Sequence, residues 1–204
     1  MCGRFHLKST PIEILEHYGV DEGAMDSAPM PSGEVFPGTE PFVVSQNEDG
    51  THIRPMFWGF RPFQVQGKKK QPINAKRESM FTSNYWKSSA MSRRCLIPVN
   101  SWDEWLAQPG QSKQRWRLGP QIENPLFSLG GLYVSYEEEG ATRKTGFAVI
   151  TQPANTAIED IHHRQPLIVM PEDYGVWLDA DTQESQVQRI TERQGVTYLR
   201  ELVG

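Results

Sequence analysis

Hydrophobic and polar residues alternate over short segments along much of this chain, which is typical of β-strands with one buried face. Two such segments, residues 42–46 and 51–58, flank Asp49-Gly50 and predict a β-hairpin, because this dipeptide favours a tight turn. Further strands are predicted at residues 95–99, 114–118, 126–136, 146–151 and 167–170.

A helix is predicted to begin at Thr10, which can cap it, with Pro11 at the first helical position and Glu13 completing a capping box. Gly19 should end this helix, and Ile12 and Leu15 should be buried by it. A helix is also predicted at residues 83–91, another opens at Pro171, and short amphipathic segments at 184–192 and 196–202 close the chain. Residues 20–40 and 61–71 are predicted to be loops.

The order of these elements, many strands with helices at the edges, predicts an α+β fold on a curved, mostly antiparallel sheet. A length of 204 residues fits a single domain over residues 1–204. No apolar run approaches the roughly 20 residues that span a bilayer, and no secretory signal is evident, so no membrane contact is expected. Two cysteines are too few for a disulfide framework, and a cytoplasmic protein is therefore predicted.

Charge is distributed unevenly along the chain. Residues 51–98 contain ten Lys or Arg and one acid, a balance of +9, so the rest of the chain carries −13 within a total of −4. A basic region in an acidic protein indicates a surface that faces a polyanion. The alternative is a solvated loop with scattered surface charge.

The most informative candidate for chemistry is Cys2. Loss of Met1 would leave an α-amine and a thiol on one residue, and this pair condenses with an aldehyde to an imine and then closes a thiazolidine ring. The ordinary pKa values, about 7.7–8.0 for the amine and about 8.5 for the thiol, keep both groups usable near neutral pH. Arg4 nearby can bind a phosphate. The alternative is that a chain begins Met-Cys by chance.

Three further groups of polar residues stand out. The first, within residues 72–78, places an amide, two cations and an acid together; a polar loop is the other interpretation. In the second, residues 100–105, strand alternation would put Trp102 and Glu104 on one face, and a carboxyl among aromatic rings has a raised pKa, as a general acid requires. The alternative is an exposed turn with packed tryptophans.

The third group is Asp160-Ile161-His162-His163-Arg164. Adjacent histidines in an extended chain point to opposite sides, and no set of ligands with zinc spacing surrounds them, so no metal is expected. One histidine acting as an acid–base, with Arg164 near a phosphate, is the functional interpretation; a surface histidine is the other.

Together these motifs resemble the SRAP (SOS response-associated peptidase) family of abasic-site-processing proteins over residues 1 to about 170. The matching motifs are Met1-Cys2-Gly3-Arg4-Phe5, Phe57-Trp58-Gly59, Ile73-Asn74-Ala75, Trp102-x-Glu104-Trp105 and Ile161-His162-x-Arg164-x-Pro166. The resemblance implies a compact domain with a barrel-like β core, peripheral helices and a basic groove for single-stranded DNA. It implies that the protein removes its own Met1 and then forms a thiazolidine crosslink to a ring-opened abasic sugar.

The resemblance also implies roles for individual residues. Cys2 would be the nucleophile, Asn74 would position the amine and the sugar, Glu104 would shuttle protons, and His162 would assist ring opening and crosslink reversal. The residues expected to contact DNA are Arg4, Trp58, Lys68, Lys69, Lys70, Lys76, Arg77 and Arg164. No cofactor is expected. The expected partner is single-stranded DNA with abasic sites, and the expected state is a monomer, nucleoid-associated if the source is bacterial.

Two positions depart from the family's pattern. Lys76 stands where arginine is usual, which keeps the charge and loses the bidentate fork. Glu34-Val35-Phe36-Pro37 stands where Asn-Val-Ala-Pro is usual, so an acid lies in an expected DNA-contact region. Two other functions fit the same residues. An N-terminal-nucleophile peptidase or amidase would use Cys2 on other substrates, and a non-catalytic single-strand-binding module would not need Cys2.

Overall fold

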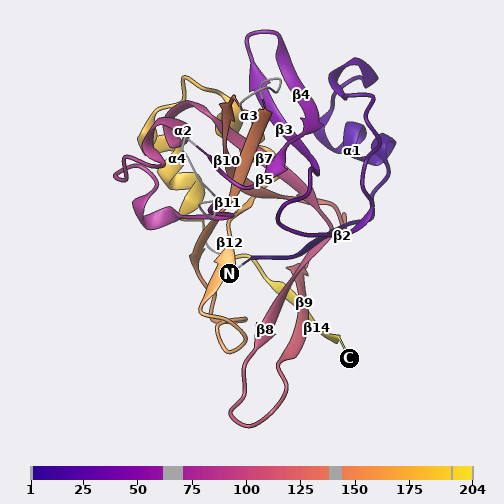
Figure 1. Ribbon diagram of the computed structural model, residues 1–204, viewed down its shortest axis with the longest axis vertical. Coiled ribbons are helices and arrows are strands. Elements are labelled where there is room, and N and C mark those ends of the chain that lie inside the picture. The colour runs from indigo at the N-terminus through magenta and orange to yellow at the C-terminus, as the bar shows by residue number, and fades with distance from the viewer. Residues whose placement is uncertain (1, 62–70, 138–143, 194, 204) are drawn as a thin grey trace.

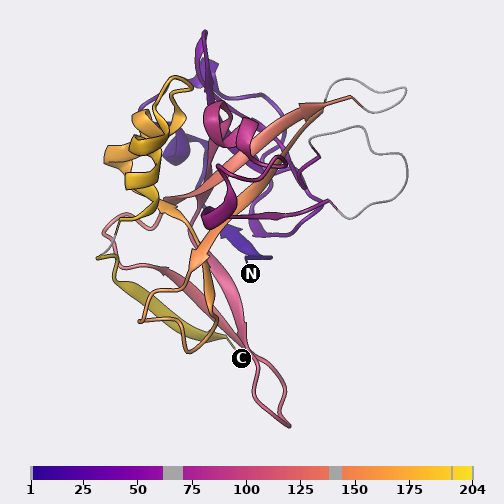
Figure 2. The same ribbon diagram turned by 90° about the vertical axis from the view of Figure 1, so that its left-hand side faces the viewer.

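The computed structural model describes residues 2–61, 71–137, 144–193 and 195–203 (Figure 1). Within these residues the strands form two sheets. The smaller sheet has the order β14 (Tyr198–Val203), β9 (Gln114–Pro120), β8 (Ser101–Leu106), β1 (Phe5–Leu7) and β2 (Gly33–Val35). Its β8–β9 hairpin extends away from the rest of the molecule, as both views show (Figures 1 and 2).

The larger sheet follows the path β12 (Arg164–Pro166), β11 (Lys144–Pro153), β10 (Phe127–Tyr136), β7 (Arg94–Val99), β3 (Phe42–Asn47) and β4 (Gly50–Pro55). Off this path, β13 (Ile168–Val169) pairs with β10, and β5 (Phe57–Trp58) and β6 (Asn74–Lys76) pair with β11. The β5 and β6 pairings are parallel, and the other strand pairings are antiparallel.

The helices lie at the periphery of the sheets (Figures 1 and 2). They are α1 (Pro11–Tyr18), α2 (Lys87–Ser92), α3 (Tyr174–Leu178) and α4 (Glu184–Thr191), with short 3₁₀ turns at η1 (Glu22–Ala24), η2 (Arg77–Ser79) and η3 (Pro171–Asp173). No helix in the described ranges is both long enough and apolar enough to cross a bilayer. The predicted α+β class with a mostly antiparallel β core is confirmed, although the strands form two sheets rather than one closed cylinder.

Helix α1 begins and ends as predicted. The Glu13 main-chain N–H donates to the Thr10 hydroxyl at 3.3 Å, the Thr10 N–H donates to the Glu13 carboxylate at 2.7 Å, and Gly19 ends the helix with a φ of 62°. The expected burial of Ile12 is wrong: its side chain is 65% exposed, and Ile14 packs in the core beside Leu15. Positions two apart in a helix point to nearly opposite sides, so Ile12 and Ile14 cannot both be buried.

Several other segments differ from the pattern-based predictions. Residues 20–40 contain η1 and β2 rather than loop alone, and the helix predicted at 83–91 is confined to Lys87–Ser92. Residues 100–105 form β8, and the closing segment 196–202 forms β14. Strand β2 has three residues, and its pairing with β1, Phe5 to Val35, lies outside what local pattern can reveal. The loop expected at 61–71 falls mostly outside the described residues.

Arg94 joins the ends of α2 and α3 from inside the core. Its side chain is 2% exposed, and its guanidinium donates to the carbonyl oxygens of Ala90 and Met91 after α2 and of Trp177 and Asp179 after α3. A helix leaves its last carbonyls without partners, so one planar cation satisfies two helix ends at once.

We therefore expect Arg94→Met to lower the free energy of unfolding by about 3–5 kcal/mol, because it strands several buried carbonyls. Arg93→Met is the matched control: Arg93 bonds the hydroxyls of Ser88 and Ser89, and a loss of about 1 kcal/mol or less is expected. Urea unfolding at neutral pH measures both, and equal losses for the two variants would contradict this role.

Candidate active site

The residues expected to carry the chemistry meet around Cys2, whose side chain is fully buried. The Asn74 side-chain amide donates to the Cys2 carbonyl oxygen at 2.9 Å, and the main-chain N–H of Arg4 donates to the Cys2 sulfur. Asn74 stands at the start of β6, where pairing with Val149 of β11 fixes its position. Its side-chain oxygen is buried and has no hydrogen-bond partner among the described residues, so an acceptor is available beside Cys2.

Glu104 reaches this site because β8 pairs with β1. Phe5 lies opposite Trp102, and the Asp103 N–H donates to the Arg4 carbonyl at 3.0 Å. Glu104 is 2% exposed, and burial raises the pKa of its carboxyl to about 7. Burial also raises the pKa of the Cys2 thiol, and the nearby Glu104 charge raises it further. A carboxyl that is about half ionised at neutral pH can both accept and deliver a proton.

His162 lies in the turn that precedes β12. The Arg164 main-chain N–H lies 2.9 Å from His162 Nδ1, and because this N–H must donate, Nδ1 accepts and Nε2 carries the ring proton. Burial lowers the pKa of His162, which favours this neutral form. The expectation that the two histidines point to opposite sides is wrong: the His162 and His163 rings stack at 4.5 Å, because the turn replaces an extended chain.

His163 also belongs to the neighbourhood of the site. Its ring interacts electrostatically with Glu104, and this interaction contributes to lowering the pKa of the Glu104 carboxyl. Interaction with His162 is the largest cause that lowers the pKa of His163. The structure therefore brings Cys2, Asn74, Glu104 and the histidine pair together from four separate segments of the chain.

The residues expected to contact DNA are placed less uniformly. Lys76 is exposed on β6 and, two positions after Asn74, shares its face of the strand. Trp58 is fully buried; its indole donates to the Ile73 carbonyl at 3.0 Å and packs against the Phe5 ring, so it offers no face to a base in this conformation. Lys68, Lys69 and Lys70 lie outside the described residues.

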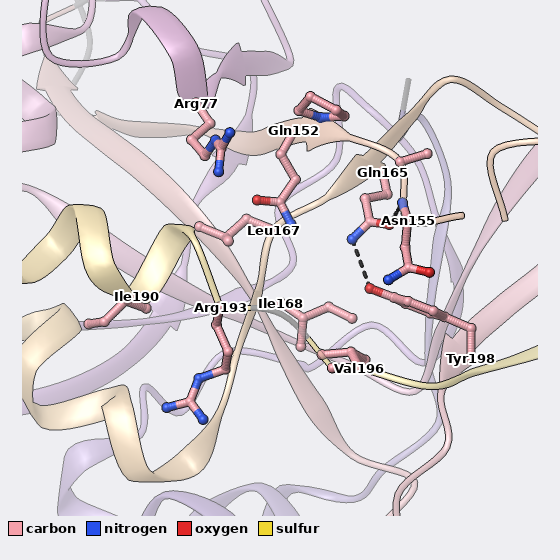
Figure 3. Close-up of a pocket in the computed structure, with 13 residues that line it drawn as sticks. Arg77, Gln152, Asn155, Gln165, Leu167, Ile168, Ile190, Arg193, Val196 and Tyr198 are labelled. Atoms are coloured by element: carbon pink, nitrogen blue, oxygen red, sulfur yellow. Dashed lines mark hydrogen bonds between the residues drawn. The ribbon is translucent and has the colours of Figure 1, made fainter. Parts of the chain in front are cut away.

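Two of the expected cations are engaged within the protein. Arg164 binds both carboxylate oxygens of Glu78 and the Thr151 carbonyl. Arg77 donates to the Thr191 carbonyl at 3.0 Å and lines a cavity of about 170 Å³ between β11, β12 and the C-terminal segment (Figure 3). Gln165 donates to the Tyr198 hydroxyl in that cavity at 2.8 Å, and none of the four expected catalytic residues is among its described lining.

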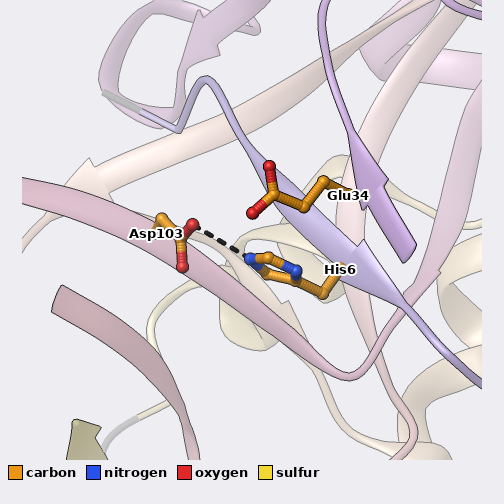
Figure 4. Close-up of side chains that lie close together, drawn as sticks. All are labelled: His6, Glu34 and Asp103. Carbon is orange, nitrogen blue, oxygen red and sulfur yellow. Dashed lines mark hydrogen bonds and ion pairs between the residues drawn. The ribbon is translucent and has the colours of Figure 1, made fainter. Parts of the chain in front are cut away.

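A cluster of charges that the sequence interpretation missed lies beside Arg4. His6, Glu34 and Asp103 converge from β1, β2 and β8 (Figure 4), and His6 Nε2 lies 2.9 Å from the Asp103 carboxylate. Arg115 Nε donates to Asp103 at 2.7 Å, and Arg115 also pairs with Glu34. The alternation Arg115-Trp116-Arg117 in β9 was the available signal, since it gives one strand face two cations.

This cluster has the composition of a metal site without its electrostatics. The three potential ligand atoms of His6, Glu34 and Asp103 lie within 4.8 Å of one another. Arg115, however, contacts both carboxylates, and Arg117 Nε lies 3.6 Å from Asp103. Arginine therefore already supplies the positive charge that these carboxylates require, and we assign no metal to them.

Comparison with known proteins places this arrangement in a family. The chain is 29% identical over 193 residues to the abasic site processing protein YedK of Escherichia coli, covering 93% of this chain and 85% of that protein. It is 28% identical over 181 residues to the abasic site processing protein YoqW of Bacillus subtilis, covering 88% and 80%.

Solved structures agree with this placement. A protein from Bacteroides thetaiotaomicron matches the fold with a TM-score of 0.84 at 18% identity, covering 100% of this chain and 92% of that one. A phage-related protein from Bordetella bronchiseptica matches with a TM-score of 0.77 at 26% identity, covering 99% and 94%. The model of the SOS response associated peptidase (SRAP) family matches residues 1–200. With nearly its whole length matched, the chain belongs to the SRAP family.

Proposed function

We propose that this protein processes abasic sites in single-stranded DNA by forming a covalent thiazolidine crosslink through Cys2, after it has removed its own Met1. The observation that carries the proposal is the pairing of a positioned Cys2 with a tuned acid: Asn74 holds the Cys2 carbonyl at 2.9 Å, and the Glu104 carboxyl has a pKa of about 7. The names of the relatives YedK and YoqW support abasic DNA as the substrate.

The proposed chemistry has two stages. Hydrolysis of the Met1–Cys2 peptide bond consumes one water and releases methionine and a free α-amine on Cys2. That amine then condenses with the open-chain aldehyde of the abasic sugar, losing one water to form an imine. The Cys2 sulfur adds to the imine carbon, and its proton passes to the nitrogen, which closes the five-membered ring.

The side chains around Cys2 suit these steps. Glu104 accepts a proton when it activates water or the thiol and returns it when the leaving group departs. His162, neutral with its proton on Nε2, donates to the ring oxygen of the closed sugar and so favours the aldehyde. The unsatisfied side-chain oxygen of Asn74 accepts a hydrogen bond from the terminal amine or from a sugar hydroxyl.

Intact-mass measurement tests the proposal in one experiment. The purified protein should have lost the mass of Met1, and incubation with an abasic single-stranded oligonucleotide should give a denaturation-resistant species of protein plus DNA less one water for each crosslink. An identical oligonucleotide without the abasic site should give no adduct. Retention of Met1 together with no adduct would reject the proposal, and turnover of unrelated peptides would instead indicate a general peptidase.

A further inference from the structure

We propose that Arg4 and Arg115 form a binding site for a backbone phosphate of the DNA strand, and that Glu34 occupies this site as an internal counter-ion that the phosphate displaces. The inference rests on the proposed single-stranded DNA substrate and adds a phosphate site and a competitor for it. It concerns Arg115 and Glu34, which have no role in the crosslinking chemistry described above.

Glu34 is bound as a phosphate would be. One carboxylate oxygen pairs with Arg115, and the other lies 3.4 Å from Nη1 of Arg4. A carboxylate and a phosphate both present two oxygens to arginine donors, so a site that holds one can hold the other. The position of Glu34 on β2, opposite His6 of β1, brings it to these arginines.

Arg4 is fixed in place yet incompletely hydrogen-bonded. Its guanidinium carbon lies 4.7 Å from the centre of the Phe36 ring and 5.0 Å from that of Trp105. Aromatic rings hold the plane of the cation and leave its edge for acceptors. Arg4 Nε is buried without a hydrogen-bond partner among the described residues, and the 3.4 Å contact with Glu34 is longer than a direct charge-assisted hydrogen bond of about 2.7–2.9 Å.

The two carboxylates that face these arginines differ in how easily they can leave. Asp103 is fully buried and is held by His6 at 2.9 Å and Arg115 at 2.7 Å. The Glu34 side chain is 39% exposed, and exposed ion pairs are weak. When Glu34 swings away, Arg4, Arg115 and Arg117 face one remaining acid, and the site carries a net positive charge.

The site is close to the proposed nucleophile. The main-chain N–H of Arg4 donates to the Cys2 sulfur, and its carbonyl accepts from Asp103 at 3.0 Å. A phosphate bound by the Arg4 side chain would therefore anchor the strand within two residues of Cys2. In this chain Glu34 tunes how tightly the strand is held before any covalent step.

The test measures binding of an unmodified fluorescein-labelled single-stranded oligonucleotide by anisotropy at several salt concentrations. Because this DNA has no aldehyde, crosslinking does not contribute to the signal. We expect Glu34→Gln to bind about three- to tenfold more tightly than the wild type. Glu40→Gln is the matched control, since it removes the same charge from an exposed acid with no arginine contact among the described residues, and it should bind as the wild type does.

Arg115→Met should weaken binding about 5- to 20-fold and lower the slope of log affinity against log salt by about one, as loss of one phosphate contact does. Arg200→Met, on β14 of the same sheet and paired with Asp160, should leave both unchanged. Thermal melting confirms that each variant is folded. The inference is overturned if Glu34→Gln binds no more tightly than Glu40→Gln, or if no variant binds the oligonucleotide. Absence of an adduct with abasic DNA would reject the proposed function and leave this comparison intact.

Discussion

Cys2→Ala is expected to abolish the denaturation-resistant adduct with abasic single-stranded DNA, lowering its yield by roughly 100-fold or more. Alanine retains an α-amine that can form an imine, and it lacks the sulfur that closes the ring. The variant should therefore be trapped on abasic DNA only when borohydride is added, which reduces the imine. Gel separation under denaturing conditions, with and without borohydride, distinguishes the two species.

Cys95→Ala is the matched control for this prediction. Cys95 is also a fully buried free thiol, but it lies in β7 opposite Gly131 of β10. Its replacement should leave the adduct yield at the wild-type level. A stable adduct from Cys2→Ala without borohydride, or its loss in Cys95→Ala, would show that the thiazolidine mechanism is wrong.

Glu104→Gln should slow crosslinking by about 10²–10⁴-fold, since it removes proton transfer and preserves the shape of the side chain. The same change should stabilise the protein at alkaline pH. Burial raises the pKa of Glu104 from 4.5 to about 7, so above pH 7 the folded protein holds a buried carboxylate that the unfolded chain would expose to water. A shift of this size destabilises the fold by about 3 kcal/mol above pH 7, and the effect fades as pH falls toward 4.5.

Chemical unfolding of wild type and Glu104→Gln at about pH 5, 7 and 8.5 measures this effect. The stability advantage of the variant should be small at the lowest pH and largest at the highest. Glu48→Gln, on an exposed turn, should differ from the wild type by about 0.5 kcal/mol or less at each pH. An advantage that does not change with pH, or a crosslinking rate equal to the wild type, would contradict the role given to Glu104.

The parts of the fold that depend on neighbouring residues could be predicted from the sequence. The capping box of α1 and the Asp49-Gly50 hairpin are set by residues within a few positions of one another, and both are present. Strand β2 could not be predicted, because three residues in a Gly- and Pro-rich segment become a strand only by pairing with β1. Periodicity alone also gave no means of dividing the strands between two sheets.

The candidate site shows the same limit. Spacing alone could not bring Asn74 to Cys2, which lies 72 residues away in sequence, and only the family resemblance suggested that they act together. Charge counting identified Arg77 and Arg164 as cations but not their long-range partners, the Thr191 carbonyl and Glu78. The role of Arg115 was hidden for a related reason, since its carboxylate partners come from two other strands.

The complete burial of Cys2 has a consequence for how the protein survives oxidants. Peroxides attack the thiolate rather than the thiol, and exposure governs how fast they reach it. Since burial raises the pKa of Cys2, its sulfur is stored as the protonated, shielded form. A protein that acts once per lesion cannot spare its single reactive sulfur, and the fold keeps that sulfur from turning into a sulfenic acid under the oxidative conditions in which damaged bases accumulate.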